Sequence, residues 1–172
     1  VMLPEGEHGI RNPEFGSIQA EHNIAALDEP GEFICIYRTT RGFPCVSYSR
    51  DDGKTWSLPQ AMTYTPGGRT IRTPRACPRI WRCENGKFLF WFHNHGGKEY
   101  AGRNPAWVIG GIERDGFVHW SEPEILLYAE DPEVRMSYPD LIEDGGKYYL
   151  TETQKSVARV HGLDATLLEG MW

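Results

Sequence analysis

The feature that most constrains the fold is a short polar segment, residues 49–56, which reads S-R-D-D-G-K-T-W. Its Asp-Asp-Gly run predicts a tight turn, because Gly adopts a positive φ without steric cost and Asp bonds its own backbone. Residues 45–49 before the turn alternate like a strand, and Pro59 after it ends regular strand pairing. The segment therefore predicts a β-hairpin with a polar turn and with Trp56 as a largely buried aromatic anchor.

The same arrangement of strand, glycine turn, strand and Trp-Ser-x-Pro occurs twice in the chain. The first copy ends at residues 56–59 and the second at residues 120–123. The turn of the second copy, residues 113–116, reads Glu-Arg-Asp-Gly and has lost the serine and the spacing of the first. One complete and one degenerate copy indicate a structural repeat.

Short strand patterns and glycine turns follow one another along the chain, and no long segment has a helical period. Aromatic residues make up 12% of the sequence, with 19 glycines and 12 prolines, which favours a fold of many strands and turns. We expect a short helical turn at 165–170 and strands at 23–27, 33–37, 45–49, 78–82, 87–92, 106–112, 117–120, 140–143, 147–152 and 157–161.

Composition also excludes several classes of function. The net charge of −6 provides no basic patch of the kind that binds nucleic acid. No apolar run approaches about 20 residues, so no membrane span is predicted. The four cysteines lack metal-ligand spacing, and we interpret them as buried free thiols. We also predict no metal site at His22, His93 and His95, because their spacing fits neither a helical nor a strand ligand pair.

The pattern S-x-D-x-G-x-T-W of residues 49–56 is called an Asp box, and it resembles the repeat of sialidase-type β-propellers. The resemblance implies an all-β fold, a β-propeller that is six-bladed in the full protein. A blade takes about 40–50 residues, so about four blades fit in residues 1–172. We expect a single partial propeller domain, and because the chain begins at Val1, we expect the missing blade or blades on its N-terminal side.

The order of polar residues between the repeats, from about residue 18 to 152, resembles the second half of a sialidase. Glu21 precedes one strand, Arg38 ends the next, Arg103 precedes the second repeat, and Tyr138 stands in a Tyr-x-Asp-Leu segment. Carried over by position, the resemblance implies that Tyr138 is the nucleophile and Glu21 the carboxylate that activates it. Arg38 and Arg103 match two of the three arginines that hold the substrate carboxylate.

The chemistry of sialic acid explains these residue types. Its anomeric carbon carries a carboxylate, which would repel an anionic nucleophile, so a neutral tyrosine replaces the usual carboxylate. A neighbouring Glu can take the phenol proton as attack begins. Arginine guanidinium groups are planar and permanently charged, which suits them to grip one carboxylate by bidentate hydrogen bonds.

Further polar residues are candidates for substrate binding. Arg75 and Arg79 are separated by an even number of positions, so on a strand they would share a face. Asp140 follows Tyr138 by two positions, and Glu152 ends a predicted strand. The first arginine of the family and its acid/base Asp have no match here, since the segment 11–13 does not fit the arginine motif. The chain by itself is therefore expected to be catalytically incomplete.

The sequence thus predicts an exo-acting glycoside hydrolase that releases terminal sialic acid or a similar acidic sugar, with sialylated or other acidic glycans as its partners. It indicates no cofactor. Two alternatives remain open: a glycosidase of another propeller family that uses Asp140 and Glu152 as a carboxylate pair, and a glycan-binding propeller without catalysis. Neither the oligomeric state nor the cell compartment follows from the sequence.

Overall fold

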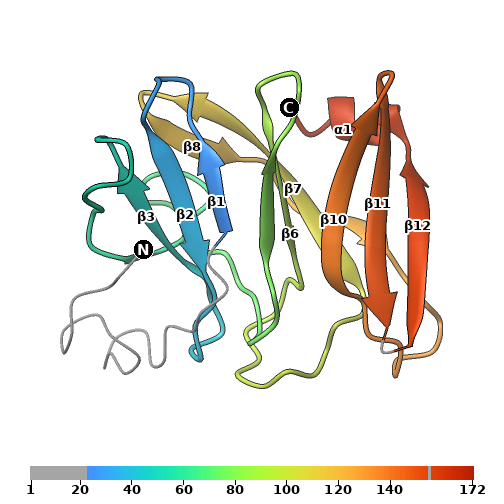
Figure 1. The fold of residues 1–172 in the computed structure, drawn as a ribbon. Helices are drawn as coiled ribbons and strands as arrows, with labels where there is room; N and C mark the ends of the chain where they lie inside the picture. The colour runs from blue at the N-terminus through green and yellow to red at the C-terminus, as the bar shows by residue number, and fades with distance from the viewer. Residues whose placement is uncertain (1–22, 155) are drawn as a thin grey trace.

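The structure, a computed structural model, describes residues 23–154 and 156–172, which form three antiparallel sheets standing side by side (Figure 1). We call the sheets blades 1, 2 and 3. Blade 1 holds β1 (Asn23–Ala26), β2 (Phe33–Tyr37), β3 (Cys45–Ser49) and β4 (Gln60–Ala61). Blade 2 holds β5 (Arg79–Arg82), β6 (Phe88–Phe92), β7 (Ala106–Arg114), β8 (Phe117–Trp120) and β9 (Glu124–Leu127). Blade 3 holds β10 (Ser137–Asp144), β11 (Lys147–Gln154) and β12 (Val157–Leu163), and helix α1 (Ala165–Glu169) follows it.

The arrangement confirms the all-β, propeller-type fold. The first strands of the blades are neighbours, because β5 lies beside both β1 and β10. The described residues form three blades, where about four were expected for the whole chain. Long connections use much of the described length, since residues 62–78, 93–105 and 128–136 contain no named strand. No helix among the described residues has the length and apolar character needed to cross a membrane.

Strand β6 of blade 2 is buried on both faces, because blade 2 lies between the other two blades. All five residues of β6 are buried, although successive side chains of a strand point to opposite faces. Phe90 belongs to the core shared with Ile34 and Ile36 of blade 1. Trp91 belongs to a second core, shared with Leu150 of blade 3. The continuous apolar run of β6 therefore provides both interfaces of the central blade.

Tight turns close two of the hairpins inside the blades. Asp115 and Gly116 both have positive φ and join β7 directly to β8. Gly145 and Gly146 join β10 to β11 in the same way. Two central residues with positive φ define a type I′ turn, whose twist matches that of the strands it connects.

The serines of the two Trp-Ser-x-Pro segments make equivalent contacts in the structure. The Ser57 N–H donates to the Tyr48 carbonyl at 2.8 Å, and the Ser57 hydroxyl accepts from the Tyr48 N–H at 3.0 Å. Ser121 forms the same two bonds with Gly110, also at 2.8 and 3.0 Å. Each serine therefore closes the outer edge of its blade by one side-chain and one backbone bond, which is the structural reason for the repeat.

The cysteines are free thiols, as the sequence predicted. Cys35, Cys45 and Cys83 are buried, whereas Cys77 is half-buried. Burial raises the pKa of the Cys35 thiol to about 11, so the thiol stays protonated and unreactive at neutral pH.

The turn at residues 49–56 is held by its own side chains. The Asp51 carboxylate accepts from the Thr55 N–H at 2.8 Å and from the Thr55 hydroxyl at 2.7 Å. Ser49 donates its hydroxyl proton to Asp51 at 3.0 Å and accepts from the Gly53 N–H at 2.9 Å. The bonds from Thr55 lower the pKa of the Asp51 carboxyl below its usual value. The polar part of the turn is thus held by hydrogen bonds among its own residues.

Trp56 packs against its own blade, as predicted, although it is not fully buried. Its ring packs at the edge of the small cluster of Cys35, Tyr37 and Cys45, and its indole N–H turns back to the Gly53 carbonyl at 3.0 Å. The ring therefore covers the outside of the cluster and remains at the surface of the blade.

Substitution of Trp56 by alanine should lower the free energy of unfolding by about 2 kcal/mol, less than for a fully buried tryptophan. Leu58 is the matched control, because it belongs to the same segment and is 61% exposed. Leu58→Ala should change the free energy of unfolding by less than about 0.5 kcal/mol. Urea unfolding of the full-length protein measures both, and equal midpoints for the two variants would contradict the anchoring role of Trp56.

Candidate active site

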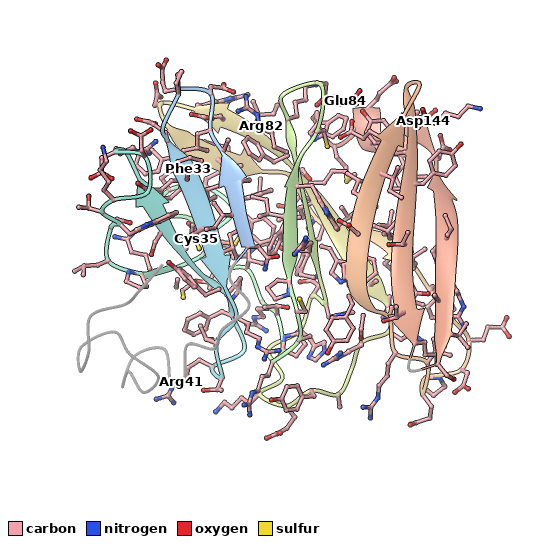
Figure 2. All side chains as sticks on the ribbon, in the orientation of Figure 1. Phe33, Cys35, Arg41, Arg82, Glu84 and Asp144 are labelled. Atoms are coloured by element: carbon pink, nitrogen blue, oxygen red, sulfur yellow. The ribbon has the colours of Figure 1, made fainter. Side chains whose placement is uncertain are left out.

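The antiparallel register brings one end of all three blades together. β1, β5 and β10 begin at this end, and β2, β6 and β11 finish there, because Asn23 lies opposite Ile36, Arg79 opposite Trp91 and Ser137 opposite Thr153. It is the lower end in Figure 1. Figure 2 places Arg41 at this lower end and Glu84 and Asp144 at the upper end, where the short turns lie. The predicted site residues Arg38, Arg75, Arg79, Arg103 and Tyr138 all belong to the lower end.

Three of the predicted arginines meet at a residue that the sequence did not single out, Tyr100. The guanidinium carbon of Arg75 lies 4.5 Å from the centre of the Tyr100 ring, and that of Arg38 lies 5.9 Å from it. The Nε–H of Arg103 donates to the Tyr100 carbonyl at 3.0 Å. Since guanidinium groups within about 6 Å of an aromatic ring are attracted to it, Tyr100 holds cations from three separate connections in one place.

Arg103 also links the arginines to blade 3. Its guanidinium donates to the Ser137 hydroxyl at 2.7 Å, and Ser137 directly precedes Tyr138. Both hydrogen bonds of the Arg103 side chain go to neutral oxygens, and no described carboxylate forms an ion pair with it. Its charge therefore remains available to an anion at this end of the protein.

Tyr138 has an unusual backbone. Between Ser137 and Asp140 the pairing of β10 with β11 shifts by one residue, which is a β-bulge. Within the bulge Tyr138 has φ +50°, a conformation that is rare and strained for an aromatic residue. The side chain is 62% exposed. A strained bulge that directs a reactive side chain toward solvent is typical of functional sites.

Asp140 lies where the first strands of the blades meet. Its carboxylate accepts from the Trp81 indole N–H at 3.2 Å and lies 4.0 Å from the Arg79 guanidinium. Arg79 in turn donates to the Asn23 side-chain oxygen at 3.1 Å. These contacts connect β10, β5 and β1 in one polar chain. Arg79 and Asp140 therefore line the inner edge of the three blades.

Arg75 and Arg79 do not share a strand face. β5 begins only at Arg79, because Pro78 has no N–H to contribute to the ladder. Arg75 belongs to the preceding connection and lies against Tyr100, whereas Arg79 faces Asn23 and Asp140. The spacing rule for strands thus does not apply to this pair, and the two arginines have different surroundings.

Glu152 is buried, with none of its side chain exposed. One carboxylate oxygen lies 3.2 Å from the Arg159 guanidinium and 3.4 Å from the His161 ring, while the other has no hydrogen-bond partner. Asp140 lies opposite Thr151, so by strand alternation it shares the face of Thr151, and Glu152 occupies the opposite face. This placement does not suit two carboxylates that flank one scissile bond.

Glu21 lies outside the described residues, so its distance to the Tyr138 hydroxyl stays a prediction. His93 and His95 have structural partners: the His93 ring lies 3.1 Å from the Pro105 carbonyl, and the His95 ring lies 2.7 Å from the Gly102 carbonyl. No group of three His, Cys, Asp or Glu side chains that could hold a metal occurs in the described part of the chain.

Sequence reasoning missed Tyr100, Trp81 and Ser137. Tyr100 and Ser137 lie in or beside long connections, where no periodic pattern marks an inward side chain. Trp81 was assigned to a strand as a largely apolar residue, but its indole N–H donates to the Asp140 carboxylate. Their only signal was proximity in the sequence to a predicted arginine or tyrosine.

The fold is similar to that of known propeller glycosidases. The leech intramolecular trans-sialidase matches with a TM-score of 0.64 at 18% identity, over 88% of this chain and 24% of that chain. The intramolecular trans-sialidase from Ruminococcus gnavus matches with a TM-score of 0.62 at 20% identity, over 88% of this chain and 34% of that one. An exo-1,5-α-L-arabinanase from a bovine ruminal metagenomic library matches with a TM-score of 0.54 at 18% identity, over 91% of this chain and 54% of the arabinanase.

These similarities show the fold, that of a sialidase-type β-propeller, and at such identities they show no more. The chain spans about a quarter of the length of the first trans-sialidase and about a third of the length of the second. No protein-family model and no curated protein sequence matches it.

Proposed function

We propose that the chain is part of an exo-acting glycoside hydrolase that releases terminal sialic acid, or a similar acidic sugar, with retention of configuration. The observation that carries the proposal is the pairing of Arg103 with Ser137. It sets a cation with no described carboxylate partner beside a strained, exposed tyrosine. A cation next to a neutral nucleophile suits a substrate whose reacting carbon bears a carboxylate.

In this proposal Arg38 and Arg103 bind the substrate carboxylate. Arg75 is a further candidate, since it shares Tyr100 with Arg38. The Tyr100 ring contacts Arg38, and the Tyr100 carbonyl and the Ser137 hydroxyl accept from Arg103. Because these contacts already orient both arginines, little conformational entropy is lost when the carboxylate binds. The first arginine of the sialidase pattern has no match in this chain, so another part of the full protein would have to supply it.

Tyr138 acts as the nucleophile. As its phenol oxygen attacks the anomeric carbon, the phenol proton passes to a carboxylate, for which Glu21 is the candidate. The bond from the anomeric carbon to the departing oxygen breaks, and an acid elsewhere in the full protein protonates that oxygen. Water then releases the sugar from the tyrosine, so two inversions give net retention. The exposure of Tyr138 supports this role, because the hydroxyl is accessible to a sugar.

A carboxylate mechanism is the second candidate, since an arabinanase shares the fold and Asp140 is exposed where the blades meet. In that case Asp140 would react and Tyr138 would only pack. Glu152 is a poor partner for Asp140, because it is buried on the opposite face of the sheet. The second carboxylate would then have to come from outside the described residues.

The proposal is tested with the full-length protein on an aryl sialoside and on neutral aryl glycosides, among them an arabinoside. We expect turnover of the sialoside alone. Arg103→Ala should lower kcat/KM for the sialoside by about 10²-fold, which corresponds to about 2.7 kcal/mol of transition-state binding. Arg114→Ala, an exposed arginine at the upper end, is the control and should leave kcat/KM unchanged. Turnover of a neutral glycoside without turnover of the sialoside would overturn the proposal.

A further inference from the structure

A cleft of about 570 Å³ lies between blades 1 and 2, apart from Tyr138 and Asp140. One wall comes from the connection after β4, the other from the segment between β8 and β9, and Asn94 of the β6–β7 connection completes the lining. Its lining residues are Tyr64, Arg69, Thr70, Arg72, Asn94, Glu122 and Pro123. A volume of this size accommodates a sugar unit or a short oligosaccharide.

The walls of the cleft are fixed to each other. The Arg69 guanidinium donates to the Glu122 carboxylate at 2.7 Å, which joins the two blades across the cleft. The same guanidinium lies 4.7 Å from the centre of the Tyr64 ring. The Tyr64 carbonyl accepts from the Trp120 N–H at 2.8 Å. The cleft is therefore largely formed before any ligand arrives, which favours binding.

The cleft carries one cation in excess. Glu122 balances the charge of Arg69. Arg72 is exposed, and none of the carboxylates that the structure describes forms an ion pair with it. It also lines an adjoining hollow of about 420 Å³ together with Gly96, so its side chain stands where the two cavities meet. A guanidinium in this position selects for a ligand with a carboxylate or a sulfate.

The remaining polar groups suit sugar hydroxyls. The Asn94 amide offers both donors and an acceptor, and the Thr70 hydroxyl offers one of each. Asn94 belongs to the connection 93–105, which also carries Tyr100 and Arg103 at the candidate active site. We propose that this cleft is a second glycan-binding site, which takes a sugar unit bearing a carboxylate or a sulfate.

The test is isothermal titration of the full-length protein carrying Tyr138→Phe, so that hydrolysis does not consume the probe, with 3′-sialyllactose, 3′-sulfated lactose and lactose. We expect at least one charged probe to bind in the cleft, with Arg72→Ala weakening that binding by about tenfold or more. Arg114→Ala removes the same charge from an exposed arginine at the upper end and should not change the affinity. The two charged probes distinguish a carboxylate ligand from a sulfate ligand.

Three results would overturn the second site. They are an absence of binding by both charged probes, equal affinities for lactose and the charged probes, and an Arg72→Ala affinity equal to that of the parent. The proposal does not depend on chemistry at Tyr138. Arg72→Ala should therefore keep the parent's turnover of a small aryl sialoside. If the parent shows no such turnover, the titration still tests the second site. Failure of the second site and failure of the proposed hydrolase activity are thus separate observations.

Discussion

Tyr138→Phe in the full-length protein should lower kcat for an aryl sialoside by about 10³-fold or more, with the urea midpoint unchanged. The substitution removes only the phenol oxygen, and the Tyr138 side chain is 62% exposed, so no core contact is lost. The backbone strain at φ +50° is the same for both aromatic residues. A loss of turnover without a loss of stability therefore reports on the oxygen alone.

Asp140→Asn is the matched control for this result. It keeps the size of the side chain and an oxygen that can accept from the Trp81 N–H, while it removes the charge near Arg79. We expect it to reduce turnover less than Tyr138→Phe does. The carboxylate mechanism predicts the reverse order, with Asp140→Asn inactive and Tyr138→Phe close to the parent. Full activity of Tyr138→Phe would exclude the tyrosine nucleophile.

Most of the fold could be predicted because its signals are local. The Asp115-Gly116 and Gly145-Gly146 turns each bring two adjacent strands into register, and the sequence shows both. β4 was missed because two residues, Gln60 and Ala61, cannot show an alternation. β9 was missed because it follows Pro123 and pairs with β7, which already pairs with β8 along part of its length.

The start of β10 shows how a functional feature escapes prediction. The sequence predicted this strand only from Asp140, directly after a proline, which cannot donate to a ladder. In the structure the strand begins at Ser137, and a bulge at Tyr138 and Pro139 accommodates the proline. The bulge lets β10 pair with β11 on both sides of the proline. The strained residue inside the bulge, Tyr138, is the candidate nucleophile.

The candidate site could be predicted as a set of residues but not as an arrangement. Arg38, Arg75 and Arg103 come from three different connections, and their common contact, Tyr100, lies in the connection of Arg103, which has no periodic pattern. Long connections carry side chains to one place through tertiary contacts, so spacing along the sequence says little about them. The resemblance to a family supplied Arg38 and Arg103, the spacing rule supplied Arg75, and the register of the strands brought their connections to one end.

The stability of this end should depend on pH through His93. Burial is the main cause that lowers the pKa of His93 to about 4 from its ordinary value of 6.5, and the charges of Arg103 and His95 lower it further. The Pro105 carbonyl, which the ring contacts, partly opposes the shift. Between pH 6.5 and 4 the unfolded chain binds a proton that the folded protein excludes, so stability falls as the pH falls through this window.

We therefore expect His93 to remove about 3 kcal/mol from the free energy of unfolding between pH 6.5 and 4, because each pKa unit corresponds to about 1.4 kcal/mol. His93→Gln is the control, since its amide can still donate to the Pro105 carbonyl but does not titrate. Urea unfolding of the full-length parent and variant across this range measures how steeply the free energy of unfolding of each protein changes with pH. Parallel slopes would show that His93 takes up its proton in the folded state. A steeper slope for the parent would show that the connection carrying Tyr100 and Arg103 is packed against an imidazole that must stay neutral.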